Sequence, residues 1–453
     1  MPPSSRHAAG VRPKPRIAAA AALAAGLMLA LSACTTADDS SDPPLPAGAT
    51  TAPTLQAFSA LSPVPLSTAR GVAAGAAAGR SLNLPRGWSA EVWAAVPGAR
   101  LAAWTPDGRL LVSTGRGGSL VLLTPQPDGR GPAVTPLLDG LDNPQGVALT
   151  TQLGRDIIVV GEETRLVAWD YAKGAVTNRR VILDGLPSGG HGSKMVAVRD
   201  GQVFYNVGSA TNSDAVDRTS TPQRATIAQV GLDGTGNRTL ATGVRNGEGL
   251  SFAPDGTLFA AINQADNQPY PFRDSSGHYG ETVPEYVNEN PVDQISRITA
   301  GTELGWPYCL PDIRGHDDLT DLGYVDHPVT NPDGDELDCA GIDRTPLGLP
   351  AHSAPVGFVF TNGSGLPEAL ADGALITAHG SWNRRPPREP YVAYSAWDAG
   401  SNSLTPAKVL VTGFQNADGT RWGRCVDAVP GPDASIYVTD DAAGLVYRLT
   451  PGR

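Results

Sequence analysis

The chain has 453 residues, with 34 Lys and Arg side chains against 45 Asp and Glu, which gives a net charge of −11 at pH 7. This acidic balance argues against nucleic acid as a partner, because clustered cations are needed to bind a phosphate backbone. The 53 glycines and 40 prolines favour many turns, and no long stretch after residue 80 has the apolar spacing of an amphipathic helix. The composition therefore predicts an all-β protein.

Residues 1–33 have the order of an export signal. Their apolar run, residues 17–31, is shorter than the roughly 20 residues that a membrane-spanning helix needs. The sequence LSAC that ends at Cys34 resembles the lipobox of bacterial lipoproteins. We therefore predict lipidation of Cys34 and a membrane-anchored lipoprotein that faces the periplasm or the cell surface; an ordinary secretory signal with a chance cysteine is the alternative. Four basic residues precede the apolar run: Arg6, Arg12, Lys14 and Arg16.

Residues 34–80 are rich in Ala, Thr, Ser, Pro, Gly and Asp and show little periodicity. This composition is typical of a linker, so we predict a flexible tether between Cys34 and a folded domain over residues 81–453. Removal of the leader takes four of the 34 basic residues and no acidic ones, so 30 basic against 45 acidic residues leave a net charge of −15.

Six copies of a hairpin pattern follow in the predicted domain. In each, a short strand enters a turn of the Asp-Gly type and a second strand leaves it, because Gly adopts positive φ without steric cost. A further apolar strand usually follows. The copies are WTPDGRLLVST from Trp104, a degenerate version at Arg155, VAVRDGQVFYNVG from Val196, SFAPDGTLFAA from Ser251, LADGALITAHG from Leu370 and AVPGPDASIYVTDD from Ala428.

Repeats of this kind, spaced by about 40–60 residues, predict small sheets stacked around an axis, because one such sheet cannot bury its own faces. The sequence therefore predicts a six-bladed β-propeller of four-stranded antiparallel blades, in preference to a large β-sandwich. The interval from Asp255 to Asp372 is much longer than the others and predicts an elaborated loop that carries function.

Three cysteines remain after removal of the leader and Cys34. In an oxidising compartment a pair of cysteines normally forms a disulfide, and Cys309 with Cys339 closes the elaborated loop over the shortest separation. Cys425 then remains as a buried, unreactive thiol. Pairing of Cys425 with either of the other two stays open.

Glycine-rich polar segments stand where propeller loops meet at the mouth of a central channel. The segments are NPQG at 143–146, GGHGSKM at 189–195, VRNGEG at 244–249, ELGWPYC at 303–309 and HGSWNRR at 379–385. Together with INQADNQPYPF and YVTDDAAGLVYR, they resemble the glucose/sorbosone dehydrogenase family of six-bladed quinoproteins over residues 82–449. The resemblance implies an enzyme that uses pyrroloquinoline quinone (PQQ) to oxidise an aldose or a sugar-derived aldehyde, with an electron acceptor that the sequence does not identify.

The resemblance assigns roles to residues at matching positions. His191 matches the family's general base, which removes a hydroxyl proton as hydride passes to the quinone. PQQ carries three carboxylates, so its site needs fixed cations and planar donors, which Arg supplies better than Lys. The residues that the resemblance assigns to PQQ are Gln145, Lys194, Arg245, Asn246 and Arg384.

The family also uses calcium to polarise the quinone, partly through backbone carbonyls of the loop after the fourth hairpin. By this resemblance the calcium ligands are expected at Gln264, Ala265 and Asp266, and Asp293 is a weaker candidate. Two tryptophans are candidates for the sugar-binding mouth. They are Trp306, for which packing between blades is the favoured interpretation, and Trp382.

Two positions depart from the pattern of the family. Gly190 precedes the base where an acidic or polar residue is common, and Glu248 stands where Gln is common. A carboxylate beside a tricarboxylate is unfavourable unless it points away or pairs with a cation such as Arg245. Two other functions stay open: a non-catalytic extracellular binding propeller, which predicts no quinone binding, and a metal-dependent lactonase-like hydrolase, which predicts a carboxylate-rich calcium site.

Overall fold

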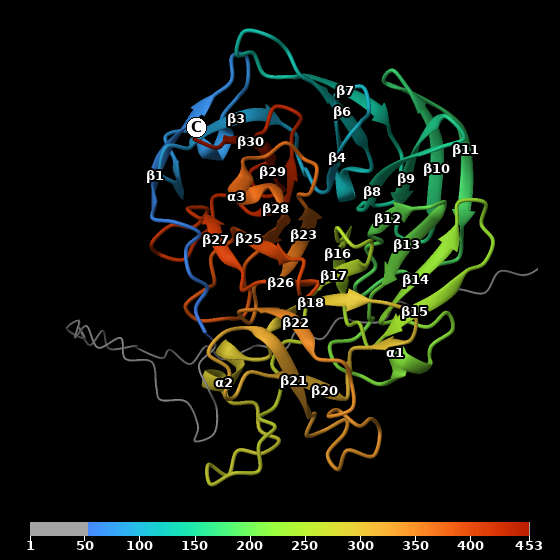
Figure 1. The fold of residues 1–453 in the computed structure, drawn as a ribbon, viewed down its shortest axis with the longest axis vertical. Coiled ribbons are helices and arrows are strands. Elements are labelled where there is room, and N and C mark those ends of the chain that lie inside the picture. Colours follow the sequence, from blue (N-terminus) through green and yellow to red (C-terminus); the bar gives the residue numbers. More distant parts are fainter. Residues whose placement is uncertain (1–52, 453) are drawn as a thin grey trace, which may run out of the picture. The chain divides into compact units, whose positions relative to one another are not determined.

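The computed structural model describes residues 53–452, which form six small β-sheets arranged as a propeller (Figure 1). This confirms the predicted six-bladed β-propeller, with strands that are mainly sequential and antiparallel within each blade. The predicted leader and lipidation site Cys34 lie outside the described residues.

The first two blades have the four antiparallel strands that the sequence predicts. In the degenerate second repeat the turn is made by Leu153 and Gly154, both at positive φ (50° and 74°), as a tight hairpin turn requires. The strands are β4 (Ala102–Trp104), β5 (Leu110–Ser113), β6 (Leu120–Thr124) and β7 (Ala133–Leu138), then β8 (Val147–Gln152), β9 (Arg155–Gly161), β10 (Leu166–Ala172) and β11 (Ala175–Leu183).

The third and fourth blades share the long interval between the fourth and fifth repeats. Instead of forming only a loop, this interval adds a parallel edge strand, β19, to the third blade and three strands to the fourth. The third blade has β12 (Val196–Arg199), β13 (Gln202–Val207), β14 (Thr226–Gly231), β15 (Arg238–Thr242) and β19 (Thr302–Glu303), and the fourth has β16 (Gly247–Phe252), β17 (Leu258–Ile262), β18 (Asp293–Ile298), β20 (Cys309–Asp312), β21 (Thr320–Asp326) and β22 (Thr345–Leu349).

The predicted disulfide is present in this insertion. Cys309, at the start of β20, is bonded to Cys339, with the Cα atoms 5.6 Å apart. Cys425 is a free, buried thiol, and burial raises its pKa well above the usual value, so it stays protonated and unreactive.

The hairpin predicted at Leu370, in the fifth blade, is wrong. Leu370 and Ala371 belong to a short helix, α3 (Glu368–Ala371), and the strand that pairs with LADGALITA comes earlier in the chain. A connection of twelve residues, 361–372, therefore replaces the tight turn expected there. The strands of this blade are β23 (Pro355–Phe360), β24 (Gly373–Ala378), β25 (Tyr391–Asp398), β26 (Ser403–Leu404) and β27 (Lys408–Val411).

The sixth blade closes the ring by joining the two ends of the described chain. β3 pairs antiparallel with β30, so blue and red strands lie side by side in Figure 1. β1 pairs with β2 and β3, so the tether predicted for residues 34–80 is wrong from Leu61 onward. The strands are β1 (Leu61–Thr68), β2 (Ser81–Pro85), β3 (Ser89–Ala95), β28 (Cys425–Pro430), β29 (Ile436–Asp440) and β30 (Leu445–Thr450).

The core lies between neighbouring blades, which is why the sheets need one another. Leu111 of the first blade and Ile158 of the second, both fully buried, belong to one apolar cluster. The first strands β4, β8, β12, β16, β23 and β28 contact one another around the axis. In an antiparallel blade the first strand begins where the second ends, so the segments NPQG, GGHGSKM, VRNGEG and HGSWNRR all reach the same end of the channel.

Helices are few and short among residues 53–452. They are α1 (Val216–Thr219), α2 (Pro284–Glu289), α3 and two 3₁₀ turns, η1 (Gly75–Ala77) and η2 (Gly115–Gly117). Within the described range, none is long and apolar enough to cross a membrane.

Candidate active site

His191 lies in the loop that leads into β12, and its hydrogen bonds determine which ring nitrogen carries the proton. Nδ1 is 3.0 Å from the carbonyl oxygen of Ser209 and 3.0 Å from its hydroxyl oxygen. The carbonyl can only accept, and the hydroxyl donates its own hydrogen to the carbonyl of Thr211 at 2.7 Å. Nδ1 therefore carries the hydrogen of the neutral ring, and Nε2 keeps a lone pair.

The surroundings of His191 favour its neutral form. Burial, and next the cation of Arg245, lower the pKa of His191 to about 4, although the hydrogen bond to Ser209 acts in the opposite direction. At neutral pH the ring is uncharged and Nε2 can accept a proton.

Two buried cationic side chains stabilise the loop that carries His191 by donating hydrogen bonds to backbone carbonyls. Lys194 donates from Nζ to the carbonyls of Pro187, at 2.9 Å, and of Gly192. Arg224 donates to three more carbonyls, those of Gly208, Ser188 and Gly189. Lys194 was expected to contact the cofactor, but its ammonium group is occupied by the loop itself. It therefore acts by positioning the loop.

Gly190 is required by the same loop. Its φ is +57°, and a Cβ atom at this position would lie 2.5 Å from the Cα atom of Ala210. The acidic or polar side chain that the resemblance implies before the base therefore does not fit in this chain, which accounts for the departure.

Arg245 and Asn246 lie side by side at the start of β16. The Arg245 guanidinium is held by Asn212, with Nη2 2.9 Å from the side-chain oxygen, and lies 3.9 Å from Asp266. Asn246 donates from Nδ2 to Glu248 Oε1 at 3.0 Å. In the described chain Asn246 Oδ1 is buried without a hydrogen-bond partner. A buried acceptor of this kind requires a donor from a bound molecule or water.

A second set of polar groups surrounds Arg100, which lies between β3 and β4. Arg100 donates from Nε to Gln145 Oε1 at 2.9 Å and from Nη1 to Asp441 at 2.9 Å. His379 Nε2 lies 3.0 Å from the same carboxylate, and Arg424 donates to His379 Nδ1 at 2.8 Å. Burial acts against it, but hydrogen bonds from His379 and Arg100 and their charges lower the pKa of Asp441 to about 2, so this carboxylate is ionised.

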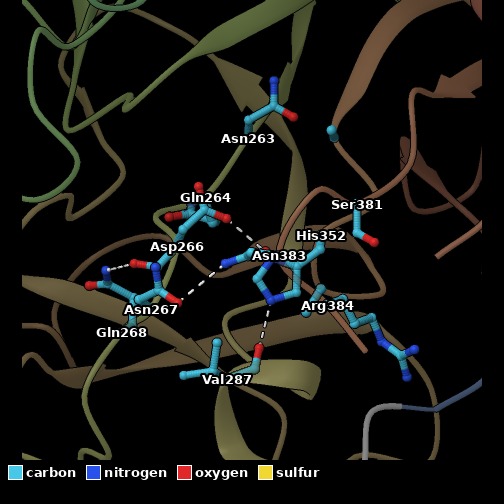
Figure 2. A network of polar contacts seen from close by, with 12 residues as sticks. Asn263, Gln264, Asp266, Asn267, Gln268, Val287, His352, Ser381, Asn383 and Arg384 are labelled. Carbon is cyan, nitrogen blue, oxygen red and sulfur yellow. Dashed lines mark hydrogen bonds and ion pairs between the residues drawn. The ribbon is translucent and has the colours of Figure 1, made fainter. Parts of the chain in front are cut away.

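The loop after β17 presents backbone carbonyls to the channel. Asp293 fixes the loop by accepting from the backbone N–H of Gln264 at 2.8 Å and from that of Ala354 at 2.9 Å. His352 supports Asp266, with Nδ1 3.3 Å from its carboxylate and Nε2 2.6 Å from the Val287 carbonyl (Figure 2). Among the described residues nothing donates to the carbonyl oxygens of Gln264 or Ala265.

Two cavities lie at this end of the channel. The smaller, of about 170 Å³, is lined by His191, Arg245, Asn246, the loop 263–266 and Trp382. The larger, of about 1090 Å³, is lined by Arg100, Gln145, Glu163, Gly190 and Gly192, among others. Polar side chains line both, and the loop that carries His191 borders both.

The two tryptophans differ in exposure. Trp306 is 2% exposed and donates from Nε1 to the Asn212 carbonyl at 3.1 Å, which confirms the packing interpretation. Trp382 is 76% exposed at the rim of the smaller cavity, as a group that stacks on a ligand requires.

The model of the TrAA12-like family matches residues 82–451. The chain belongs to the TrAA12-like family. Among curated proteins, this TrAA12-like chain is 26% identical over 351 residues to the pyrroloquinoline quinone-dependent pyranose dehydrogenase of Coprinopsis cinerea, covering 66% of this chain and 46% of the relative. An uncharacterized protein of Borreliella burgdorferi is 26% identical over 262 residues, covering 57% of this chain and 60% of that protein. The matches thus span about half of each curated relative.

Solved structures share the fold of this TrAA12-like chain. The PQQ domain of the Coprinopsis cinerea pyranose dehydrogenase, in its holo form, has a TM-score of 0.70 at 20% identity and covers 85% of this chain and 100% of that domain. The calcium structure of a Trichoderma reesei family AA12 protein has a TM-score of 0.67 at 18% identity, covering 81% and 96%. The resemblance to quinoprotein sugar dehydrogenases is thus confirmed at the level of relatives and fold.

The structure brings most of the predicted site residues of this TrAA12-like protein to the channel, but not Lys194, described above, or Arg384. Nη2 of Arg384 is paired with Glu289 of α2 at 2.7 Å. Figure 2 shows the guanidinium pointing away from Gln264 and Asp266. The predicted carboxylate clamp at Arg384 is therefore corrected. The residues that reach the channel are His191, Gln145, Arg245, Asn246, Gln264, Ala265 and Asp266.

Five polar residues of the site were missed by the sequence analysis. His379 belongs to the HGSWNRR segment, of which only Arg384 is assigned to the cofactor from the sequence. Asp441 belongs to the segment YVTDDAAGLVYR. Their positions directly after second strands of blades were a usable signal. The five missed residues are Arg100, His352, His379, Arg424 and Asp441.

Proposed function

We propose that this protein is a PQQ-dependent dehydrogenase that oxidises an aldose or a sugar-derived aldehyde. The observation that carries the proposal is the neutral His191, with its lone pair on Nε2, in the same small cavity as Arg245 and the unpaired oxygen of Asn246. The names of the curated relative and of the solved PQQ domain support the same cofactor.

The donor set of the channel fits PQQ. A tricarboxylate needs several fixed guanidinium groups, and Arg100 and Arg245 stand at the two cavities, each held in place by hydrogen bonds. Gln145 and Asn246 add planar amides. Asn246 Oδ1 and Asn263 Oδ1, both buried and unpaired within the described chain, are acceptors left for a ligand or its water.

In this proposal the chain binds and orients the sugar while PQQ, when bound, supplies the electrophilic quinone that accepts hydride. His191 Nε2 receives the proton of the substrate hydroxyl as the carbon–hydrogen bond breaks. Ser209 holds the ring in the required tautomer through Nδ1. Trp382 offers an exposed ring at the rim on which a pyranose can stack. The two electrons then leave to an acceptor that is not identified.

Calcium is part of the proposal, and the loop after β17 would hold it. The carbonyl oxygens of Gln264 and Ala265, free of donors among the described residues, and the carboxylate of Asp266 are hard oxygen ligands of the kind that calcium prefers. No cluster of three or more His, Cys, Asp or Glu side chains suited to a metal occurs in residues 53–452, so ligands would come largely from the backbone and the bound cofactor.

The subcellular localisation of the protein is proposed from the predicted leader alone. An export signal that ends in LSAC supports a lipoprotein anchored to a membrane through Cys34, outside the cytoplasm. The Cys309–Cys339 disulfide is consistent with an oxidising compartment.

PQQ and calcium together are expected to stabilise the folded protein. A ligand that binds only the native state, present at about 100 times its Kd, adds about 2.7 kcal/mol to the free energy of unfolding. The measurement is the Tm of the purified protein with PQQ, with calcium, with both, and with neither, followed by dye reduction with a panel of aldoses. An unchanged Tm in all four conditions would contradict the proposal and favour the binding propeller. Hydrolysis of lactones without PQQ would favour the hydrolase.

Arg100 and Arg384 form a matched pair of substitutions. Arg100→Ala is expected to weaken PQQ binding by about 10- to 100-fold, because a hydrogen bond to a charged group contributes about 1.5–3 kcal/mol. Arg384→Ala should change the affinity less than about threefold, because its guanidinium is paired with Glu289 outside the cavities. The measurement is a fluorescence titration of each variant with PQQ. A larger loss in Arg384→Ala than in Arg100→Ala would contradict the corrected assignment.

A further inference from the structure

We infer that Glu248 carries a proton when PQQ is bound, so that this site takes up PQQ together with a proton. The inference rests on the proposed function, because the ligand is PQQ. It goes further by assigning to Glu248 a role as a hydrogen-bond donor in cofactor binding.

The geometry around Glu248 leaves one of its oxygens without a partner. Glu248 is on β16 and is 8% exposed. Oε1 accepts from Asn246 Nδ2 at 3.0 Å. Oε2 is buried and accepts no hydrogen bond from the described chain. The nearest cation is Arg100, whose Nη2 is 4.0 Å from Oε2, beyond hydrogen-bond distance.

The charge of Arg100 is not available to Glu248 only, because Arg100 also binds Gln145 and Asp441. Its Nε and Nη1 are used by Gln145 and Asp441, each at 2.9 Å. Asp441 is ionised and is a second negative charge near Glu248. The cation that the sequence analysis offered as a partner, Arg245, instead lies 3.9 Å from Asp266.

The balance of these groups makes Glu248 easier to protonate than an ordinary carboxyl group. Burial raises the pKa of Glu248, and Asp441 acts in the same direction, whereas Arg100 and the hydrogen bond from Asn246 act in the opposite direction. The other titratable or charged groups around the channel are His379 and Arg424, which are bound to Asp441 and to each other, and Arg245.

The chemistry of PQQ adds a reason for the proton. Its carboxylates and quinone oxygens are acceptors, so an ionised Glu248 would repel the ligand and offer it no hydrogen. A protonated Oε2 is a donor, as the amide of a Gln would be. Glu248 lies between Asn246, which lines the smaller cavity, and Arg100, which lines the larger one. A bound anion further favours the protonated form of a nearby acid, so binding and proton uptake reinforce each other.

Proton uptake can be measured on the unaltered protein. Calorimetric titration of the purified protein with PQQ at pH 7 and at pH 8.5, with saturating calcium and in two buffers of different ionisation enthalpy at each pH, gives the number of protons taken up. We expect the wild type to take up more protons than Glu248→Gln, by a difference that approaches about one as the pH is raised to 8.5 and the carboxyl of the free protein ionises, and the PQQ Kd of the wild type to rise by about tenfold per pH unit at alkaline pH. Glu248→Gln should lose this slope and bind PQQ more tightly than the wild type at pH 8.5.

Glu163→Gln is the matched control. Glu163 lines the larger cavity, but its carboxylate accepts from the Gly189 N–H and from Asn143, each at 3.1 Å, and these hydrogen bonds lower its pKa. It is already ionised, so the pH slope should persist in this variant. PQQ binding without proton uptake by the wild type at pH 8.5, or an equal slope in Glu248→Gln, overturns the inference alone. No PQQ binding by any form at either pH overturns the proposed function as well.

Discussion

Replacing His191 with Ala is expected to lower kcat by about 10²- to 10⁴-fold, the range over which a positioned general base accelerates a reaction. PQQ should still bind within a few-fold of the wild-type Kd, because Arg100, Arg245 and Asn246 remain in place. The measurement is dye reduction at saturating sugar, together with PQQ titration of the same preparation. Activity retained in His191→Ala would remove this residue as the base.

The control for that experiment is a histidine remote from the channel. His278 is exposed and bonds Glu281 at 2.8 Å, so His278→Ala should leave kcat unchanged. The pH profile is a second readout. A base accepts a proton only when neutral, so activity is present above the pKa of His191 and is lost as the pH falls through it. Burial and Arg245 lower that pKa to about 4, so the acidic limb is expected below the ordinary histidine value of 6.5.

Replacing Arg245 with Lys is expected to weaken PQQ binding by about 10- to 100-fold and to lower kcat/KM. Lysine keeps the positive charge but lacks the planar set of donors of a guanidinium group. In Arg245, Nε donates to the Asn212 carbonyl at 3.1 Å and Nη2 donates to the Asn212 side-chain oxygen at 2.9 Å. The charge also keeps Asp266 compensated, so the fold should survive, whereas Arg245→Met would leave that carboxylate with His352 alone.

A spectroscopic readout separates binding from structural damage in Arg245→Lys. The pKa of His191, followed by NMR in the absence of PQQ, should change little, because a cation remains beside the ring; in Arg245→Met it should rise, since the coulombic effect of Arg245 lowers it in the wild type. Unchanged PQQ affinity in Arg245→Lys would show that the planar guanidinium of Arg245 is not needed to bind PQQ.

The fold could be predicted because each repeat carries its own local signal. Asp107 and Gly108, for example, sit between apolar strands that can form only a hairpin, and the spacing of such hairpins requires neighbouring sheets. β1 could not be predicted, because its sequence, LSPVPLST, has the composition of a linker, and it is a strand only through pairing with β2 and β3. Its stability comes from tertiary contacts that composition does not reveal.

A site residue could be predicted where the same short segment contains the residue and the start of a first strand, which fixes its position at the channel. His191, Arg245 and Asn246 each enter a first strand directly, so the hairpin pattern brings them to the channel. Arg384 was misplaced because its partner, Glu289, is 95 residues away in the insertion. Arg100 and Asp441, 341 residues apart, meet only because β3 closes the ring against β30.

The most direct test of the proposed function is a single turnover without an electron acceptor. Purified protein loaded with one equivalent of PQQ and with calcium is mixed anaerobically with a panel of aldoses, and the absorbance of PQQ is followed. We expect at least one sugar to convert the bound cofactor from its oxidised to its reduced spectrum, rapidly in the wild type and about 10²- to 10⁴-fold more slowly in His191→Ala. Bound PQQ that stays oxidised with every sugar, or that is reduced equally fast in His191→Ala, would contradict a dehydrogenase built around His191.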